Sequence, residues 1–242
     1  MVEKYSKYDQ ELISILAHDL RTPINSTRHF MDLANHAGRM GNDEKQSEYM
    51  ERAQQGLSRM SQLIDDVLEM SRLEQDAKLN LEPCDLAAQI QECLQMLEGA
   101  AMNKNVSLEV QLEDNLPAVE ADPARLQQIL SNLVGNAIKY NRQDGEVLIE
   151  GWANGGGVTL KVADTGYGIQ QADLGRIFEP FYRTRLGKER KIPGSGLGLA
   201  ITHKIVQRHG GTIEVESVQG EGTTFTLKLL DKVPDVLPPS GE

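Results

Sequence analysis

The chain carries two glycine-rich segments, Asp164-Thr165-Gly166-Tyr167-Gly168-Ile169 and Gly194-Ser195-Gly196-Leu197-Gly198-Leu199. The first leaves a strand-like pattern at 157–163, and the second enters an amphipathic, helical pattern at 197–209. Glycine backbone at a helix N-terminus offers N–H groups to anions, so the second segment favours a phosphate ligand. Either segment alone is weak evidence, because the second lacks the Gly-Lys-Ser ending of a Walker loop. Together they indicate a polyphosphate site.

The surrounding residues, 76–231, predict an α+β unit with helices over one face of a mixed sheet. Strand patterns occupy 79–83, 106–112, 147–153, 157–163, 211–217 and 223–229, with a turn at Asn154-Gly155-Gly156. Helices are predicted from the capping Asp85 to about Met102, from Pro123 after the capping Asp122 to Tyr140, and over 197–209. The proline-rich residues 232–242 are expected to be a disordered tail.

Residues 1–75 predict a helical hairpin that turns at Gly38 and at Gly41-Asn42-Asp43. Apolar residues in both arms alternate by steps of four and three, the spacing of a helix-bundle seam. They are Ile13, Ala17, Leu20, Ile24, Thr27, Met31 and Ala34, then Met50, Ala53, Leu57, Met60, Ile64 and Val67. Two helices cannot close a core, so we expect a homodimer in which a second copy completes a four-helix bundle.

Composition excludes several classes of protein. A formal net charge of −11 opposes binding to nucleic acid. The longest stretch free of Asp, Glu, Lys and Arg, 126–138, falls short of the roughly 20 apolar residues of a membrane span. The N-terminus has no signal-peptide pattern, so a cytoplasmic location is expected. Cys84 and Cys93 are interpreted as buried free thiols.

His18 is expected on an outer face of the first helix, because its neighbour Ala17 lies on the apolar stripe. Asp19, Arg21 and Thr22 surround it with polar groups, and Pro23 is predicted to kink and loosen the helix there. From composition alone, an ordinary surface histidine is the simpler interpretation. The second unit supplies the context that favours a functional role.

A basic segment lies between the two glycine-rich segments and includes Arg176, Arg183, Arg185, Lys188, Arg190 and Lys191. It is threaded with Phe178, Pro180, Phe181 and Tyr182. A run of charges is often simply a solvated face, but the position of this one between two phosphate-type segments favours a mobile lid that closes over an anion. In the helix before it, Asn132, Asn136 and Lys139 can project to one side. Amide oxygens suit Mg²⁺ beside phosphate, and Lys139 can neutralise phosphate charge. Capping or polar packing is the alternative interpretation.

In their order along residues 9–230, these segments resemble the motifs of sensor histidine kinases of two-component signalling. Residues 17–23 resemble the phosphoacceptor box and 132–137 the asparagine box. The two glycine-rich segments resemble the two glycine boxes, and 178–182 the phenylalanine box. The resemblance implies that 1–75 form the dimerisation and phosphotransfer domain. It also implies that 76–231 form the ATP-binding sandwich shared with DNA gyrase and the ninety-kilodalton heat-shock chaperone.

The same resemblance implies roles for single residues. His18 would attack the γ-phosphate of ATP, Asp19 would orient the imidazole and accept its proton, and Thr22 would position water during dephosphorylation of a partner. Asn136 would hold Mg²⁺ with support from Asn132, and Asp164 would accept a hydrogen bond from the adenine amine. The other implied ATP-binding residues are Lys139, Tyr140, Gly166, Gly168, Ile169, Phe178, Arg183, Gly194, Ser195, Gly196, Leu197, Gly198, Leu199 and Thr223.

The implied reaction is autophosphorylation of His18, followed by transfer to an aspartate of a response regulator and, as often in the family, later removal of that phosphate. ATP-hydrolysing relatives carry a glutamate base where this chain has Asn132, which disfavours an ATPase. A nucleotide-binding scaffold or phosphatase-dominant module is the alternative. Because the helical pattern starts at once, we expect the catalytic portion of a longer receptor, with any membrane attachment upstream.

Overall fold

The computed structural model describes residues 2–74, 78–190 and 192–232, and their side chains except those of 2–15, 17–19 and 74. The chain divides into two compact units, Met1–Ser71 and Arg72–Glu242. The predicted domain boundary after residue 75 lies outside the described residues, as does the predicted tail beyond residue 232. No helix among the described residues is both long and apolar enough to cross a membrane.

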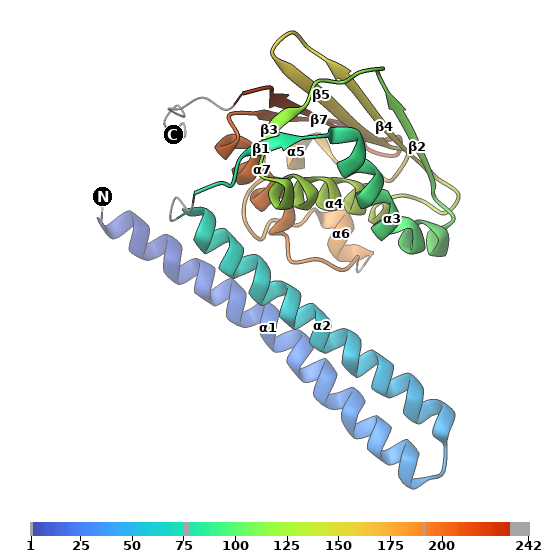
Figure 1. Ribbon diagram of the computed structural model, residues 1–242. Helices are drawn as coiled ribbons and strands as arrows, with labels where there is room; N and C mark the ends of the chain where they lie inside the picture. Colours follow the sequence, from blue (N-terminus) through green and yellow to red (C-terminus); the bar gives the residue numbers. More distant parts are fainter. Residues whose placement is uncertain (1, 75–77, 191, 233–242) are drawn as a thin grey trace. The chain divides into compact units, whose positions relative to one another are not determined.

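The first unit is a hairpin of two antiparallel helices, α1 (Val2–Arg39) and α2 (Asp43–Glu74), which lie side by side (Figure 1). Asn42 caps the second helix, since its side-chain oxygen accepts a hydrogen bond from the Lys45 N–H at 3.0 Å. Gly41 takes the left-handed conformation that the turn requires, with φ of +69°. Helix α1 continues through Pro23.

The apolar stripe of the hairpin separates into two sets. The interior holds mostly small side chains: Thr27, Ala34, Ala37 and Ala53 are buried, together with the larger Leu63. The helices approach closely at Thr27, where a side chain at Gly56 would overlap the threonine hydroxyl. The larger apolar residues Ile24, Met31, Met50, Leu57 and Ile64 are exposed, and they recur seven residues apart along each helix. A heptad spacing of this kind places them along one face of each helix.

The second unit contains a five-stranded mixed sheet in the order β2-β4-β5-β7-β6. Its strands are β2 (Ser107–Leu112), β4 (Glu146–Ala153), β5 (Gly157–Asp164), β6 (Thr212–Val218) and β7 (Gly222–Leu230). Strands β2 and β4 are parallel, and the other neighbours are antiparallel. A separate two-stranded sheet pairs β1 (Glu82–Cys84) with β3 (Val119–Ala121).

Three helices cover one face of the large sheet (Figure 1): α3 (Leu86–Lys104), α4 (Pro123–Lys139) and α7 (Gly198–Arg208). This arrangement confirms the predicted α+β class. The predicted caps are also confirmed: Asp85 accepts hydrogen bonds from the Ala87 and Ala88 N–H groups, and Asp122 from that of Arg125. Large side chains from helices and sheet meet between the two layers, including Leu126, Leu130, Leu160, Ile205 and Leu227, all below 2% exposed.

Some elements differ from the prediction. The strand expected at 79–83 is the three-residue β1, shifted to Glu82–Cys84, because its hydrogen-bonding partner is the equally short β3. Two short helices, α5 (Gln171–Leu174) and α6 (Arg185–Glu189), were not predicted. Neither is long enough to display a helical repeat.

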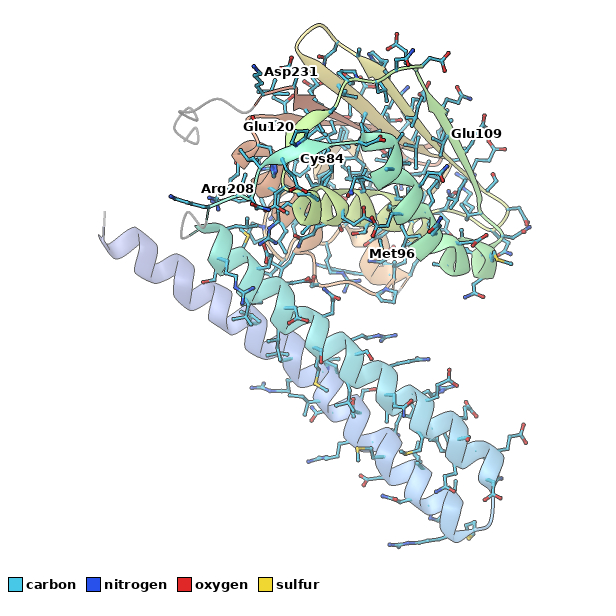
Figure 2. The ribbon with its side chains drawn as sticks, viewed as in Figure 1. Cys84, Met96, Glu109, Glu120, Arg208 and Asp231 are labelled. Atoms are coloured by element: carbon cyan, nitrogen blue, oxygen red, sulfur yellow. The ribbon has the colours of Figure 1, made fainter. Side chains whose placement is uncertain are left out.

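Cys84 and Cys93 are buried free thiols, as predicted. Cys84 lies on β1 (Figure 2), and its thiol contacts the Ala121 carbonyl oxygen at 3.3 Å. Burial raises the pKa of the Cys93 thiol to about 11, so its reactive thiolate is rare at neutral pH.

Candidate nucleotide-binding site

Asp164 ends β5 and provides a largely buried carboxylate. Its Oδ1 atom accepts hydrogen bonds from the Gly166 N–H at 2.8 Å and the Thr223 N–H at 3.3 Å. Among the described residues, none donates to Oδ2. Burial raises the pKa of Asp164 to about 6, and the two backbone hydrogen bonds only partly offset that effect. The site therefore presents one unengaged acceptor oxygen in a poorly solvated place.

The first glycine-rich segment is tied to two neighbouring elements. Gly166 packs against backbone, because a side chain there would overlap the Tyr140 carbonyl oxygen. That oxygen accepts the Tyr167 N–H at 3.1 Å. On the other side, the Ile169 N–H donates to Ser217 Oγ at 2.8 Å, while Gly168 has a φ of +65° and abuts the Val218 carbonyl. These contacts place the segment between the end of α4 and the β6–β7 hairpin.

Helix α4 brings Asn132, Asn136, Lys139 and Tyr140 to the same region. The Asn136 Nδ2 donates to Asn132 Oδ1 at 3.2 Å, which confirms that the two amides share one face. The Lys139 ammonium lies 5.0 Å from the centre of the Tyr140 ring. Burial raises the pKa of Tyr140, so its phenol stays protonated at neutral pH.

The second glycine-rich segment leads into α7 beside these residues. A side chain at Gly194 would lie 2.8 Å from the Lys139 ammonium, so the segment and the lysine are neighbours. Gly196 has a φ of +76° and packs against the backbone of Phe181, where a side chain would collide. The Leu197 N–H donates to Ser195 Oγ at 3.2 Å, and the Leu197 side chain is buried. Leu199 follows at the start of α7 and is half-buried.

The basic segment between the glycine-rich segments is ordered by specific contacts. Phe178 stacks on His203 of α7, with ring centres 5.0 Å apart, and meets Phe225 edge-on. Thr184 caps α6 by accepting the Gly187 N–H at 3.2 Å. The Arg190 guanidinium lies 4.1 Å from the centre of the Tyr167 ring, so this segment reaches back to the first glycine-rich segment. Its predicted mobility remains a prediction, and Lys191 lies outside the described residues.

Arg183 is held within that segment. Its Nη2 group donates to the carbonyl oxygens of Gly187 and Ile192. Its Nε is buried without a hydrogen-bond partner among the described residues. A buried donor of this kind is costly to leave unsatisfied, which suits a nearby acceptor such as a phosphate oxygen.

The residues fit a magnesium–nucleotide ligand. No hydrogen bond engages Asn136 Oδ1 in the described part of the chain, and an amide oxygen is a suitable ligand for Mg²⁺. The described residues contain no group of three or more His, Cys, Asp or Glu side chains that could hold a metal ion. A magnesium ion here would therefore take most of its ligands from phosphate and water, as is common for this metal in nucleotide sites.

The predicted phosphoacceptor lies in the other unit. The backbone of His18 and Asp19 is helical within α1, but their side chains lie outside the described residues, so their predicted exposure and roles stay predictions. Thr22, one turn along α1, is exposed.

Sequence reasoning missed two buried polar residues that support the site. Asn141, fully buried, donates from Nδ2 to the Glu146 carbonyl and accepts the Arg142 N–H, so it shapes the chain between α4 and β4. Thr202 on α7 accepts a hydrogen bond from Asn132 Nδ2 at 2.7 Å. Asn141 directly follows the Asn132–Tyr140 motif, which was a usable signal, whereas nothing in the sequence distinguishes Thr202.

Two family models match the chain. Residues 9–76 match the "His Kinase A (phospho-acceptor) domain", and residues 121–233 match the "Histidine kinase-, DNA gyrase B-, and HSP90-like ATPase". The chain is 36% identical over 215 residues to the sensor histidine kinase ZraS of Escherichia coli strain K12, covering 88% of this chain and 44% of that protein. The aligned part of the chain corresponds to less than half the length of the curated relatives that it matches, for example 29% of one and 44% of ZraS.

Solved structures agree with this result. The histidine kinase AdeS of Acinetobacter baumannii matches with a TM-score of 0.70 and 28% identity, over 88% of this chain and 97% of that one. Full-length ShkA, solved with AMPPNP, matches with a TM-score of 0.66 and 30% identity, over 90% of this chain and 45% of that one. The chain belongs to the sensor histidine kinases of two-component signalling and contains the two domains of their catalytic region.

Proposed function

We propose that this chain binds ATP with Mg²⁺, phosphorylates His18, and passes the phosphoryl group to an aspartate of a response regulator. The observation that supports ATP binding most directly is the hydrogen bonding of the Asp164 carboxylate. Its Oδ1 is occupied by two backbone N–H groups, and no described residue donates to its Oδ2, although burial of the carboxyl is sufficient to raise its pKa to about 6. An adenine amine would satisfy that oxygen. Lys139, Arg183 and the second glycine-rich segment supply positive charge and N–H groups for the phosphates.

In the proposed reaction, a ring nitrogen of His18 forms a bond to the γ-phosphorus as the bond between that phosphorus and the leaving ADP oxygen breaks. Asp19 orients the imidazole and takes its proton. When bound through Asn136, Mg²⁺ would neutralise charge on the phosphate oxygens. Asn132 is an amide and cannot take a proton from water, which favours transfer to histidine over hydrolysis.

We also propose that the hairpin works as a homodimer. The exposed heptad residues Ile24, Met31, Met50, Leu57 and Ile64 form the face that a second hairpin would cover. The domain limits that go with this proposal are 1–75 for phosphotransfer and 76–231 for ATP binding. Thr22 is proposed to position water when the chain removes phosphate from its partner.

The test is incubation of the purified chain with γ-labelled ATP and Mg²⁺. We expect a label that is lost in acid, survives alkali, is absent from His18→Gln, and moves to a receiver domain when the cognate one is added. His36→Gln is the matched control, because His36 is an exposed histidine of the same helix and this variant should label normally. Nucleotide binding without any label would support the scaffold alternative instead. Loss of both label and binding in His18→Gln would indicate misfolding of that variant.

A further inference from the structure

A chain of hydrogen bonds links α7 to the free amide oxygen of Asn136. Thr202 Oγ1 accepts from Asn132 Nδ2 at 2.7 Å, and Asn132 Oδ1 accepts from Asn136 Nδ2 at 3.2 Å. Thr202 is only 1% exposed, so water cannot replace the protein partner readily. The chain begins at a buried hydroxyl and ends at the oxygen that the proposed function assigns to Mg²⁺.

The direction of these bonds determines which atom Asn136 presents. A side-chain amide has an acceptor at one end and a donor at the other. In the structure the Asn132 NH₂ group donates to Thr202, and the Asn132 oxygen engages the NH₂ group of Asn136, so Thr202 anchors one end of this pair of amides. Asn136 Oδ1 is then the side-chain atom of Asn136 that no described residue engages in a hydrogen bond. If Asn132 turned over, it would present NH₂ to Asn136, and Asn136 would turn as well. An NH₂ group cannot bind a cation.

Gly198 strengthens the same constraint from one turn earlier on α7. A side chain at Gly198 would overlap Asn132 Oδ1 and lie 3.2 Å from Asn132 Nδ2. The Asn132 amide therefore lies directly over the first turns of α7, with Thr202 as the hydrogen-bonding partner there.

We propose that Thr202 is a positioning residue, which acts through Asn132 to turn Asn136 Oδ1 toward the magnesium ion of the bound nucleotide. This inference rests on the proposed function, because it assigns Asn136 to the metal. It predicts that the Thr202 hydroxyl contributes to magnesium-dependent binding and has little influence on nucleotide binding without the metal.

The test compares Thr202→Val, which keeps the shape and loses the hydroxyl, with Thr202→Ser, which keeps the hydroxyl. The dissociation constant of a fluorescent ATP analogue is measured on the intact chain with excess Mg²⁺ and with EDTA. We expect Thr202→Val to reduce the gain in affinity due to Mg²⁺ by about tenfold, the lower range for loss of a group that orients a metal ligand. Its affinity in EDTA should stay within about twofold, and Thr202→Ser should restore the gain.

Thr159→Val is the matched control. Thr159 is also a buried threonine whose hydroxyl accepts an asparagine NH₂ group, from Asn154 at 2.8 Å, but it lies on β5 outside the site. It should lower the melting temperature without changing the magnesium gain. Thr202→Ala is a second variant without the hydroxyl, for use if the valine variant folds poorly.

Different outcomes separate this inference from the proposed function. A wild-type magnesium gain that Thr202→Val and Thr202→Ala both retain overturns the positioning role alone. Equal losses with Mg²⁺ and with EDTA also overturn it, because the hydroxyl would then serve the fold only. A wild-type chain that gains no affinity from Mg²⁺ overturns the magnesium part of the proposed function together with this inference.

Discussion

The two units of the chain bury different kinds of residues. The hairpin interior holds mostly small side chains such as Ala34, Ala37 and Ala53, with Leu63 as a buried larger one, while Leu57 is 53% and Ile64 is 47% exposed. In the α+β unit, large side chains such as Leu130, Leu160 and Ile205 are fully buried between helices and sheet. Burial of a large aliphatic side chain is worth roughly 1.5–3 kcal/mol, so the second unit can be stable alone. The hairpin leaves much of its apolar surface uncovered.

Buried polar groups follow the same division. In the α+β unit, Asn141, Thr202 and His209 are buried and hydrogen-bonded, and the buried Arg183 Nε, which lacks a partner among the described residues, lies at the candidate site. In the hairpin, the Thr27 hydroxyl is buried beside Gly56 with no hydrogen-bond partner among the described residues. The α+β unit therefore has a specified interior of its own, on which a precise ligand site can be built. The hairpin, in our account, acquires a complete core only as a pair.

The largest expected effect on the α+β unit comes from Asp164→Asn. The two backbone N–H groups would keep the amide oxygen, so the amide NH₂ would replace Oδ2 and face the adenine amine, donor against donor. We expect nucleotide affinity to fall by about 100-fold, near the upper range for loss of a hydrogen bond to a charged group. Titration with a fluorescent ATP analogue measures this.

The same variant should not be less stable. A pKa raised from 3.8 to about 6 means that the buried charge costs roughly 3 kcal/mol of folding stability at neutral pH, and asparagine removes that charge. Asp85→Asn is the control, because asparagine also caps helices and should leave binding unchanged. Denaturation of Asp164→Asn at much lower temperature, with binding lost, would make Asp164 a structural residue.

A smaller effect concerns pH and His209. Its Nε2 accepts the Asp122 N–H at 3.0 Å and its Nδ1 donates to the Ile205 carbonyl at 2.8 Å, so the folded site requires the neutral ring. Burial lowers the pKa of His209, with a smaller contribution from Arg208 and Arg125, while the Ile205 bond and Asp122 oppose it. The unfolded histidine takes up a proton first as pH falls below about 6.5, so stability is lost there and is complete above that value.

The effect of His209 can be measured only when Asp164 is replaced by a residue that does not titrate. The raised pKa of Asp164 changes stability in the opposite direction, because the folded state gains stability as the pH falls from about 6. Urea denaturation of Asp164→Asn between pH 8 and pH 5.5 should show a loss of about 1 kcal/mol, the net worth of one hydrogen bond. That loss should become smaller in Asp164→Asn with His209→Gln, which leaves the contribution of His203, whose pKa is also lowered by burial. A pH-dependent loss of equal size in both variants would contradict the role of His209.

Local signals allowed much of the fold to be predicted. The caps Asp85 and Asp122 depend on residues a few positions apart, and the structure has them as expected. The two helices of the hairpin are also as predicted, but the apolar stripe divides among the described residues into buried small side chains and exposed large ones. Strand β3 was missed because its pairing with β1 is non-local. Thr202 was missed for the same kind of reason: its partner Asn132 is distant in sequence, and by itself it is an ordinary helix residue.

The measurement that tests the contrast between the units most directly is the molar mass from light scattering, compared between the wild-type chain and the double variant Leu57→Glu/Ile64→Glu. The nucleotide affinity of both proteins is measured alongside. We predict that the wild-type chain has twice the 26.8 kDa chain mass, and that the variant has the single mass with nucleotide affinity unchanged. A monomeric wild-type chain, or a monomeric variant that no longer binds nucleotide, would contradict the account.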